Sequence, residues 1–391
     1  MAEQSGEGRR KMQKFLDRFR DGVGCVGVEF TDRLVRLLQI RSWKGSLDVA
    51  GVSTQPMPMT AEPGADQEAL VARLRSAVVA GGFVGRRCVV ALPRSEVQIY
   101  TTRLPEMPLD ELAEAVKWEA SERLGRERDS IEADFIRTGA MGEGGRQEIL
   151  IVATGTDILE RRLNAVMAAG LRPMAVDTHF GAIARVMSRQ HRREADQGSI
   201  RAVIEIGDVG STMLVLHGEQ IALCRSLDIG GNHLDARVSE HLGLELEAAA
   251  DLRQHRLQGD QNHQDASVDP ATDRAVHECI RPLLEELSRD VLMCMRYYGV
   301  TFKGQKPAKL MLTGAHACEP GLAAAISQRC EMPVDLDDEH GTFSHLGTSL
   351  SQARSRSNGP HSAWSIAAGL SLRSLAARRT RRINTKLERA A

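Results

Sequence analysis

The stretch AVIEIGDVGSTMLVL, residues 202–216, predicts two β-strands joined by a short polar turn. Glu205 stands near the end of the first strand, and the turn after it contains two glycines and two hydroxyl side chains. Successive backbone N–H groups in a tight turn form a concave site for anions, and glycine lets a phosphate approach the backbone. Hydroxyl groups can donate to phosphate oxygens. The stretch therefore indicates a phosphate-binding hairpin, with candidate residues Glu205, Gly207, Gly210, Ser211 and Thr212.

A related stretch, VGVEFTDRLVRLLQI, occupies residues 26–40. It has the same succession of strand, acidic residue (Glu29) and turn, but its turn contains Thr31 and Asp32 and no glycine. The aspartate would repel a phosphate, although Arg33 and Arg36 could offset part of that charge. Because tight turns also use glycine, aspartate and serine for geometry alone, each hairpin by itself is a weak signal. Together the two hairpins predict a duplicated phosphate-binding site, in which the second hairpin has the more suitable residues for binding phosphate.

Two further glycine turns follow the second hairpin. In LDIGGNHLDARVSEHLGL, residues 227–244, Gly230 and Gly231 precede a predicted helix. In KLMLTGAHACEPGLAAAISQRCEMPVDL, residues 309–336, a strand runs into Gly314 and Ala315 ahead of another helix. Helix N-termini that follow glycine turns are favourable anion sites. These turns support the interpretation of the hairpins as parts of a nucleotide site.

Along the rest of the chain, predicted strands alternate with helices, which is typical of an α/β protein. Apolar stripes at helical spacing occupy residues 109–124, 158–167 and 283–295. A polar stretch at about 253–273 is interpreted as an exposed insertion. The predicted strands cover residues 26–30, 34–40, 47–52, 87–92, 97–103, 148–153, 202–206, 212–216, 220–226 and 309–313.

Bulk composition narrows the class of protein. The 391 residues suffice for two or more domains. Lysine plus arginine number 51 and aspartate plus glutamate 52, a balance that does not indicate nucleic-acid binding. The seven cysteines are scattered without a Cys-x-x-Cys pair, as in reduced cytosolic chains. Because neither a signal peptide nor a run of about eighteen apolar residues occurs, we expect a cytoplasmic protein.

Both ends of the chain are basic. Residues 1–22 combine a short amphipathic helical pattern with lysines and arginines, and residues 374–391 form a basic tail. Each cation near an anionic lipid surface contributes about 1 kcal/mol of attraction. We therefore consider contact with an anionic membrane surface, and a location peripheral to the inner membrane, with solvated tails as the alternative.

The order of these motifs resembles that of the actin-like ATPase superfamily, and within it the PilM family, the cytoplasmic actin-like component of the type IV pilus inner-membrane platform. The resemblance runs from about residue 25 to about residue 373. MPLDELAEAVKWEASERLG at 107–125 is similar to the family's Met-Pro, acidic helix and Trp-Glu-Ala segment. EILIVATGTDILERRLNAVMAAGLRPMAVDTHFGAIARVM at 148–187 resembles its strand, helix and Ala-Gly-Leu passage, and SAWSIAAGLSLR at 362–373 its terminal helix.

This resemblance implies a two-lobed actin-like fold, a duplicated ribonuclease H-like α/β architecture. The first lobe would span 23–200 with an inserted subdomain at about 105–175, and the second lobe 201–373. Family members bind ATP with magnesium between the lobes and grip the cytoplasmic N-terminal peptide of a PilN-type bitopic membrane protein, next to other platform components. The implied nucleotide-binding positions are Thr31, Arg36, Gly207, Gly210, Ser211, Thr212, Gly230, Gly231, Asp251, Arg253, Gly314 and Ala315; Glu29 and Glu205 would hold magnesium indirectly, and Glu205 is the catalytic candidate.

The sequence departs from the family pattern at the nucleotide motifs. Glu29 stands where the first motif has aspartate, the glycine of that turn is missing, and Ala315 replaces the second glycine of the adenosine turn. In-line attack needs phosphate, metal and water placed accurately together. We therefore predict a scaffold of a pilus or secretion platform that has weakened or lost ATP binding. An active ATPase or small-molecule kinase, and an FtsA-like membrane-associated filament protein, are the alternatives.

Overall fold

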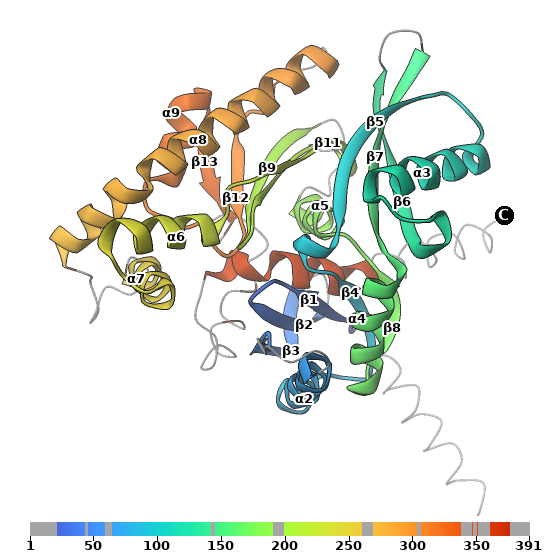
Figure 1. Cartoon of the computed structure of the whole chain (residues 1–391), viewed down its shortest axis with the longest axis horizontal. Helices are drawn as coiled ribbons and strands as arrows, with labels where there is room; N and C mark the ends of the chain where they lie inside the picture. The colour runs from blue at the N-terminus through green and yellow to red at the C-terminus, as the bar shows by residue number, and fades with distance from the viewer. Residues whose placement is uncertain are drawn as a thin grey trace, which may run out of the picture.

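The computed structural model describes residues 22–43, 46–58, 65–141, 145–190, 199–259, 269–302, 306–337, 346, 350 and 360–375. These residues form two five-stranded sheets and one three-stranded sheet. Figure 1 shows the two larger sheets on either side of helix α5 and of the red helix that spans residues 365–375. The α/β class expected from the sequence is confirmed. The basic segment 1–22 and the tail 374–391 lie almost wholly outside the described residues.

The first sheet has the strand order β3-β2-β1-β4-β8. Its strands are β1 (Val26–Phe30), β2 (Leu34–Trp43), β3 (Ser46–Pro56), β4 (Arg87–Ala91) and β8 (Arg172–Val176). The first three strands are antiparallel, whereas β4 and β8 run parallel to β1. Helices α2 (Ala65–Ala80) and α4 (Thr156–Ala168) pack on the outer face, where they bury Val26, Val28 and Phe30. Since alternate residues of a strand face opposite sides, Glu29 faces inward.

The second sheet repeats this plan in the order β11-β10-β9-β12-β13. Its strands are β9 (Ile200–Ile206), β10 (Ser211–His217), β11 (Gln220–Leu227), β12 (Leu310–Thr313) and β13 (Val334–Leu336). Three antiparallel strands are again followed by two parallel ones. The hairpins also agree in register, because Glu29 pairs with Arg36 and Glu205 pairs with Thr212. The duplicated, two-lobed architecture predicted from the sequence is confirmed.

The described residues of the second lobe include the helices α6 (Gly231–Leu242), α7 (Leu246–Gly259), α8 (Pro270–Phe302) and α9 (Leu322–Cys330). Residues of α6, α7, α8 and α9 share a buried core with the outer face of the second sheet. The expectation of an exposed insertion at 253–273 is wrong for its first part. Residues up to Gly259 continue helix α7, in which Arg253 and Arg256 are buried, and α8 begins at Pro270.

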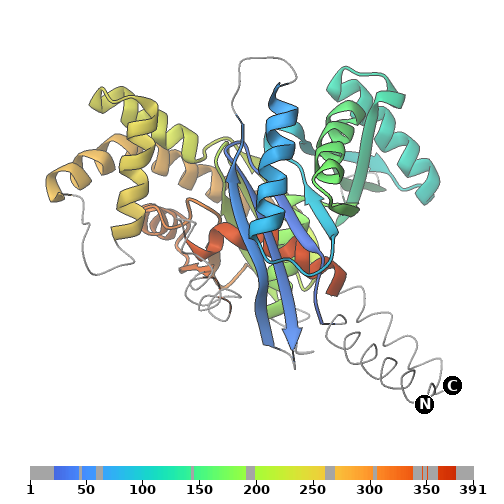
Figure 2. The same ribbon diagram turned by 90° about the horizontal axis from the view of Figure 1, so that it is seen from below.

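The third sheet has the order β5-β7-β6, with strands β5 (Gln98–Pro105), β6 (Ile131–Met141) and β7 (Arg146–Gly155). Helix α3 (Leu109–Leu124) covers it through Leu112, Val116 and Ala120. Figure 2 shows this unit and the second-lobe helices on opposite sides of the first sheet. The predicted insertion at about 105–175 needs different bounds. The third sheet already begins at Gln98, and β8, inside the predicted range, belongs to the first sheet.

Two helices cross between the larger sheets: α5 (His179–Gln190) and the helix of residues 365–375, which follows η5 (His361–Trp364). They touch at Gly369, where a Cβ atom would lie 2.1 Å from the carbonyl oxygen of Ala182. The later helix is bonded to the first lobe, because the Ser371 hydroxyl donates to the Cys25 carbonyl at 2.7 Å and accepts from the Ile40 amide at 2.9 Å. At its start the same helix is bonded to the second lobe, because Ser365 contacts Thr313 and Asp337, so it joins both lobes.

Candidate functional site between the lobes

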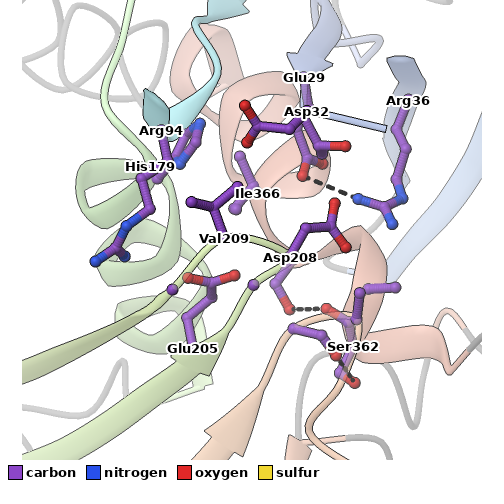
Figure 3. Close-up of a pocket in the computed structure, with 17 residues that line it drawn as sticks. Glu29, Asp32, Arg36, Arg94, His179, Glu205, Asp208, Val209, Ser362 and Ile366 are labelled. Carbon is purple, nitrogen blue, oxygen red and sulfur yellow. Dashed lines mark hydrogen bonds and ion pairs between the residues drawn. The ribbon is translucent and has the colours of Figure 1, made fainter. Parts of the chain in front are cut away.

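The two hairpins bring their acidic residues to one pocket between the lobes. Alternation along β1 and β9 buries Val28 and Ile204 in the outer cores, so Glu29 and Glu205 point to the inner faces. In Figure 3, Glu29 and Arg36 reach into the pocket from the first lobe, and Glu205 and Asp208 from the second. The predicted residues that line this pocket are Glu29, Thr31, Arg36, Glu205, Gly207, Gly210, Gly314 and Ala315.

Both glutamates are deeply buried. Burial raises the pKa of Glu29 to about 7, against the opposing charge of Arg36, whose Nη1 lies 3.2 Å from Glu29 Oε1. Burial likewise raises the pKa of Glu205 to about 7; Arg94 opposes this shift and Glu29 adds to it. Among the described residues, Glu29 Oε2 has no hydrogen-bond partner. Near neutral pH these carboxyl groups are therefore only partly ionised.

The first hairpin uses its polar groups to hold its own turn. The Thr31 hydroxyl accepts hydrogen bonds from the amides of Arg33 at 3.2 Å and Leu34 at 2.9 Å. Asp32 accepts from the Ser95 hydroxyl. The polar side chains of this turn, Thr31 and Asp32, are thus hydrogen-bonded to other groups of the protein.

The second hairpin, which the sequence suggested as the better phosphate cradle, is also bonded internally. The Ser211 hydroxyl donates to the Ile229 carbonyl at 2.6 Å, and Gly207 donates its amide to the Gly210 carbonyl at 3.1 Å. Asp208 lies 3.0 Å from His316. Although burial acts to raise it, the hydrogen bond and charge of His316 hold the pKa of Asp208 well below its usual range. Asp208 is thus an anion at the centre of the supposed anion site.

The N-terminus of α6 packs directly on this turn. The Gly231 amide donates to the Gly207 carbonyl at 2.9 Å, and the Asn232 amide donates to the Asp208 carbonyl at 2.8 Å. A Cβ atom on Gly230 would lie 2.4 Å from the Gly210 amide nitrogen. Gly230 therefore serves close backbone packing, and the helix amides that could bind an anion are already used.

The pocket residues that the sequence did not indicate include two with titratable side chains, Arg94 and His179, and four within residues 362–366. Arg94 follows β4 in η1 (Arg94–Glu96) and donates to Thr212 Oγ1 at 2.7 Å and to the Leu227 carbonyl at 3.1 Å. His179 begins α5; burial, reinforced by the charge of Arg94, lowers its pKa to about 4. A signal for Arg94 existed, because β4 is parallel to β1 and the carboxyl ends of parallel neighbours meet at one sheet edge.

Two of the predicted positions, Asp251 and Arg253, do not line the pocket, whereas Gly314 does. Asp251 is exposed on α7. Arg253, two residues on, is buried and donates to Glu319 at 2.6 Å, to the Gly231 carbonyl at 3.0 Å and to Asp235. At the adenosine turn, Gly314 has a φ of +104°, which favours glycine, and a Cβ there would lie 2.6 Å from the Ile206 carbonyl oxygen. Both features place Arg253 and Gly314 in internal packing.

The pocket between the lobes has a cavity volume of about 30 Å³ in this structure. Within the described ranges, no group of three or more His, Cys, Asp or Glu side chains could hold a metal ion. The hydroxyls of Ser211 and Thr212 and the first amides of α6 are bonded to protein groups in this structure.

Two sheets of the same strand order, joined by crossing helices and facing each other through paired hairpins, define an actin-like protein. A family profile described as type IV pilus assembly protein PilM matches residues 27–375. The chain belongs to that family.

Solved structures agree on the fold. A chain of the PilM-PilN type IV pilus biogenesis complex is 20% identical, with a TM-score of 0.69, over 90% of this chain and 99% of that one. The ethanolamine utilization protein EutJ from Carboxydothermus hydrogenoformans is 14% identical, with a TM-score of 0.51, over 90% of this chain and 89% of that one. In the part of the chain that the structure describes, no helix is both long and apolar enough to span a membrane.

Proposed function

We propose that this protein is a cytoplasmic actin-like scaffold of a type IV pilus or related secretion platform. It binds the cytoplasmic N-terminal peptide of a PilN-type membrane protein and sits against the inner membrane through that partner, with its basic ends near anionic lipid. Its ATP binding is weakened or lost. The platform role is supported by the family match over residues 27–375 and by similarity to a chain from a PilM-PilN complex.

One observation carries the proposal about ATP. The phosphate-binding groups predicted in the second hairpin are bonded to the protein itself: Ser211 to Ile229, Thr212 to Arg94, and the α6 amides to Gly207 and Asp208. A nucleotide would have to break these bonds and displace the anionic Asp208 before it gained any of its own. The cost of leaving buried polar groups unpaired is about 1–3 kcal/mol each, which weakens nucleotide affinity.

The partner is tested with a synthetic peptide. Its sequence is the N-terminus of the bitopic membrane protein encoded next to this chain, and titration calorimetry measures its binding to the full chain. We expect saturable 1:1 binding of that peptide and none of a scrambled peptide of equal composition. Equal heats from both peptides, or no heat from either, would refute the PilN-type partner.

The nucleotide proposal is tested separately. Calorimetry with ATP and magnesium should give no saturable binding at micromolar concentration, and phosphate release should stay at the buffer rate. The active-enzyme alternative predicts the opposite: hydrolysis that Glu205→Gln abolishes and the exposed control Glu219→Gln preserves. Filament formation, measured by sedimentation with and without ATP, distinguishes the FtsA-like alternative.

A further inference from the structure

We propose that Arg94 is a built-in cationic latch, which holds the two lobes together in the place where a bound ligand would otherwise bridge them. The inference concerns how the cleft is kept closed. It stands independently of the partner peptide and of the scaffold role.

Arg94 crosses from one lobe to the other. Its backbone belongs to the first lobe, directly after β4, whereas both of its acceptors belong to the second lobe. Thr212 Oγ1 on β10 accepts at 2.7 Å, and the carbonyl of Leu227, the last residue of β11, accepts at 3.1 Å. A single guanidinium thus ties the second hairpin and the adjacent strand end to the first lobe.

The guanidinium lies beside the glycine turn that the sequence suggested for a phosphate. A Cβ atom built on Gly210 would lie 2.6 Å from the Leu227 carbonyl oxygen and 3.1 Å from Arg94 Nη2. Glycine at this position therefore allows both the strand end at Leu227 and the guanidinium to approach the turn closely.

The surroundings suit a cation. A hydroxyl, a backbone carbonyl and the nearby carboxyl of Glu205 are oxygen groups of the type that hard cations attract. The charge of Arg94 favours ionised Glu205 and, together with burial, keeps His179 neutral. Arg94 therefore supplies positive charge to the cleft without a metal ion.

The first lobe holds Arg94 in position. The next turn residue, Glu96, receives two hydrogen bonds from Arg162 of α4, at 2.9 and 2.5 Å, and its carbonyl accepts from Thr154 at 2.8 Å. Pro93, with φ −56°, precedes the turn. Because η1 is anchored on both sides, the side chain of Arg94 loses little further freedom when it bonds to the second lobe.

Other contacts cross the cleft, but they differ in kind. Arg33 Nη2 lies 2.7 Å from Asp235 of α6, with the Arg33 side chain 37% exposed. This pair joins Arg33 to helix α6, whereas Arg94 bonds to Thr212 and to the Leu227 carbonyl. Arg33 at the rim is accordingly a matched control for Arg94 at the centre.

The test compares Arg94→Met with Arg33→Met by hydrogen exchange of the full chain, with small-angle scattering as a second readout. Arg94→Met should speed amide exchange at residues 207–212 and 227–231 by about tenfold or more and enlarge the radius of gyration. Arg33→Met should change exchange there by less than about threefold. Equal exchange in wild type and Arg94→Met, or an equal effect of both variants, would overturn the latch.

A second variant keeps the test decisive if Arg94→Met fails to fold. Thr212→Val removes an acceptor and keeps the arginine, and it should speed exchange in the same segments by a smaller factor. Unchanged exchange in Thr212→Val would also count against the latch. Amide hydrogen exchange tests the latch. Titration of the same variants with peptide and with ATP tests the proposed function, so failure of one proposal can be told from failure of the other.

Discussion

Glu205 makes the stability of the protein depend on pH. Its pKa is raised from 4.5 to about 7 by burial, so between these values the folded state holds a proton that the unfolded state has released. The free energy of unfolding consequently falls as pH rises through this window. Glu29 acts in the same direction. The two buried carboxyl groups favour the folded state most on the acid side of neutrality.

Replacing this carboxyl group with an amide removes its titration. For Glu205→Gln we expect the free energy of unfolding at pH 8 to rise by roughly 2 kcal/mol relative to wild type, and its decline between pH 5 and pH 8 to become shallower. Urea denaturation of wild type and variant at pH 5 and at pH 8 measures these free energies of unfolding. The exposed control Glu219→Gln should behave as wild type. A Glu205→Gln protein that is less stable at pH 8 would show that the carboxylate is stabilising.

At the scale of elements, α6, α7 and the turn before α9 are joined by a buried ion-pair network. Arg253 on α7 pairs with Asp235 of α6 and with Glu319, and Arg256 lies 3.0 Å from Glu319 and 2.7 Å from Asp273 of α8. Buried carboxylates are tolerated only when paired. This network therefore helps to set the spacing of helices α6, α7 and α8 and of the turn before α9.

Arg253→Met should be strongly destabilising because it leaves Asp235 and Glu319 short of a partner. We expect a loss of about 3–5 kcal/mol in the free energy of unfolding, measured by urea denaturation. Arg237→Met is the matched control on α6, since the Arg237–Glu240 pair is exposed and should contribute less than about 1 kcal/mol. Similar losses in both variants would contradict the structural role assigned to Arg253.

At the scale of the whole molecule, the third sheet is fastened to the second lobe although it is inserted in the first. Arg225 of β11 donates to Thr101 of β5 at 2.8 Å and lies 3.8 Å from Glu148 of β7. The Tyr297 hydroxyl of α8 donates to Glu148. Relative movement of the lobes therefore has to break this contact as well as those inside the cleft.

Two Tyr→Phe substitutions test this attachment. Tyr297→Phe should cost about 1–3 kcal/mol, because it leaves the buried Glu148 with fewer donors, and should speed amide exchange in β5 and β7 more than in β1 and β2. Tyr100→Phe is the control, since the buried Tyr100 hydroxyl has no partner among the described residues, and it should be neutral. Uniform acceleration over all three sheets would argue against a local fastening.

The duplicated hairpins and the inward direction of their acidic side chains could be predicted from the sequence, because they follow from a repeated motif and from the alternation of residues along a strand. The hairpins around Glu29 and Glu205 share a pattern, and strand alternation turns both side chains inward. Arg94 was missed because its acceptor Thr212 lies 118 positions away, and its place shortly after a predicted strand was its only local signal. Arg253 was assigned to nucleotide for a related reason: composition cannot show that Asp235 and Glu319 surround it. Contacts between distant segments were thus the unpredictable part.

The helix of residues 365–375 also affects how the protein is made. Ser371 bonds to Cys25 across 346 positions of sequence, and the helix packs on the inner face of the first sheet. Synthesis proceeds from the N-terminus, and segments left without their partners expose apolar surface in the meantime. The first lobe therefore cannot complete its core until nearly the whole chain has left the ribosome, and a nascent chain stopped before residue 365 would present that uncovered face to chaperones.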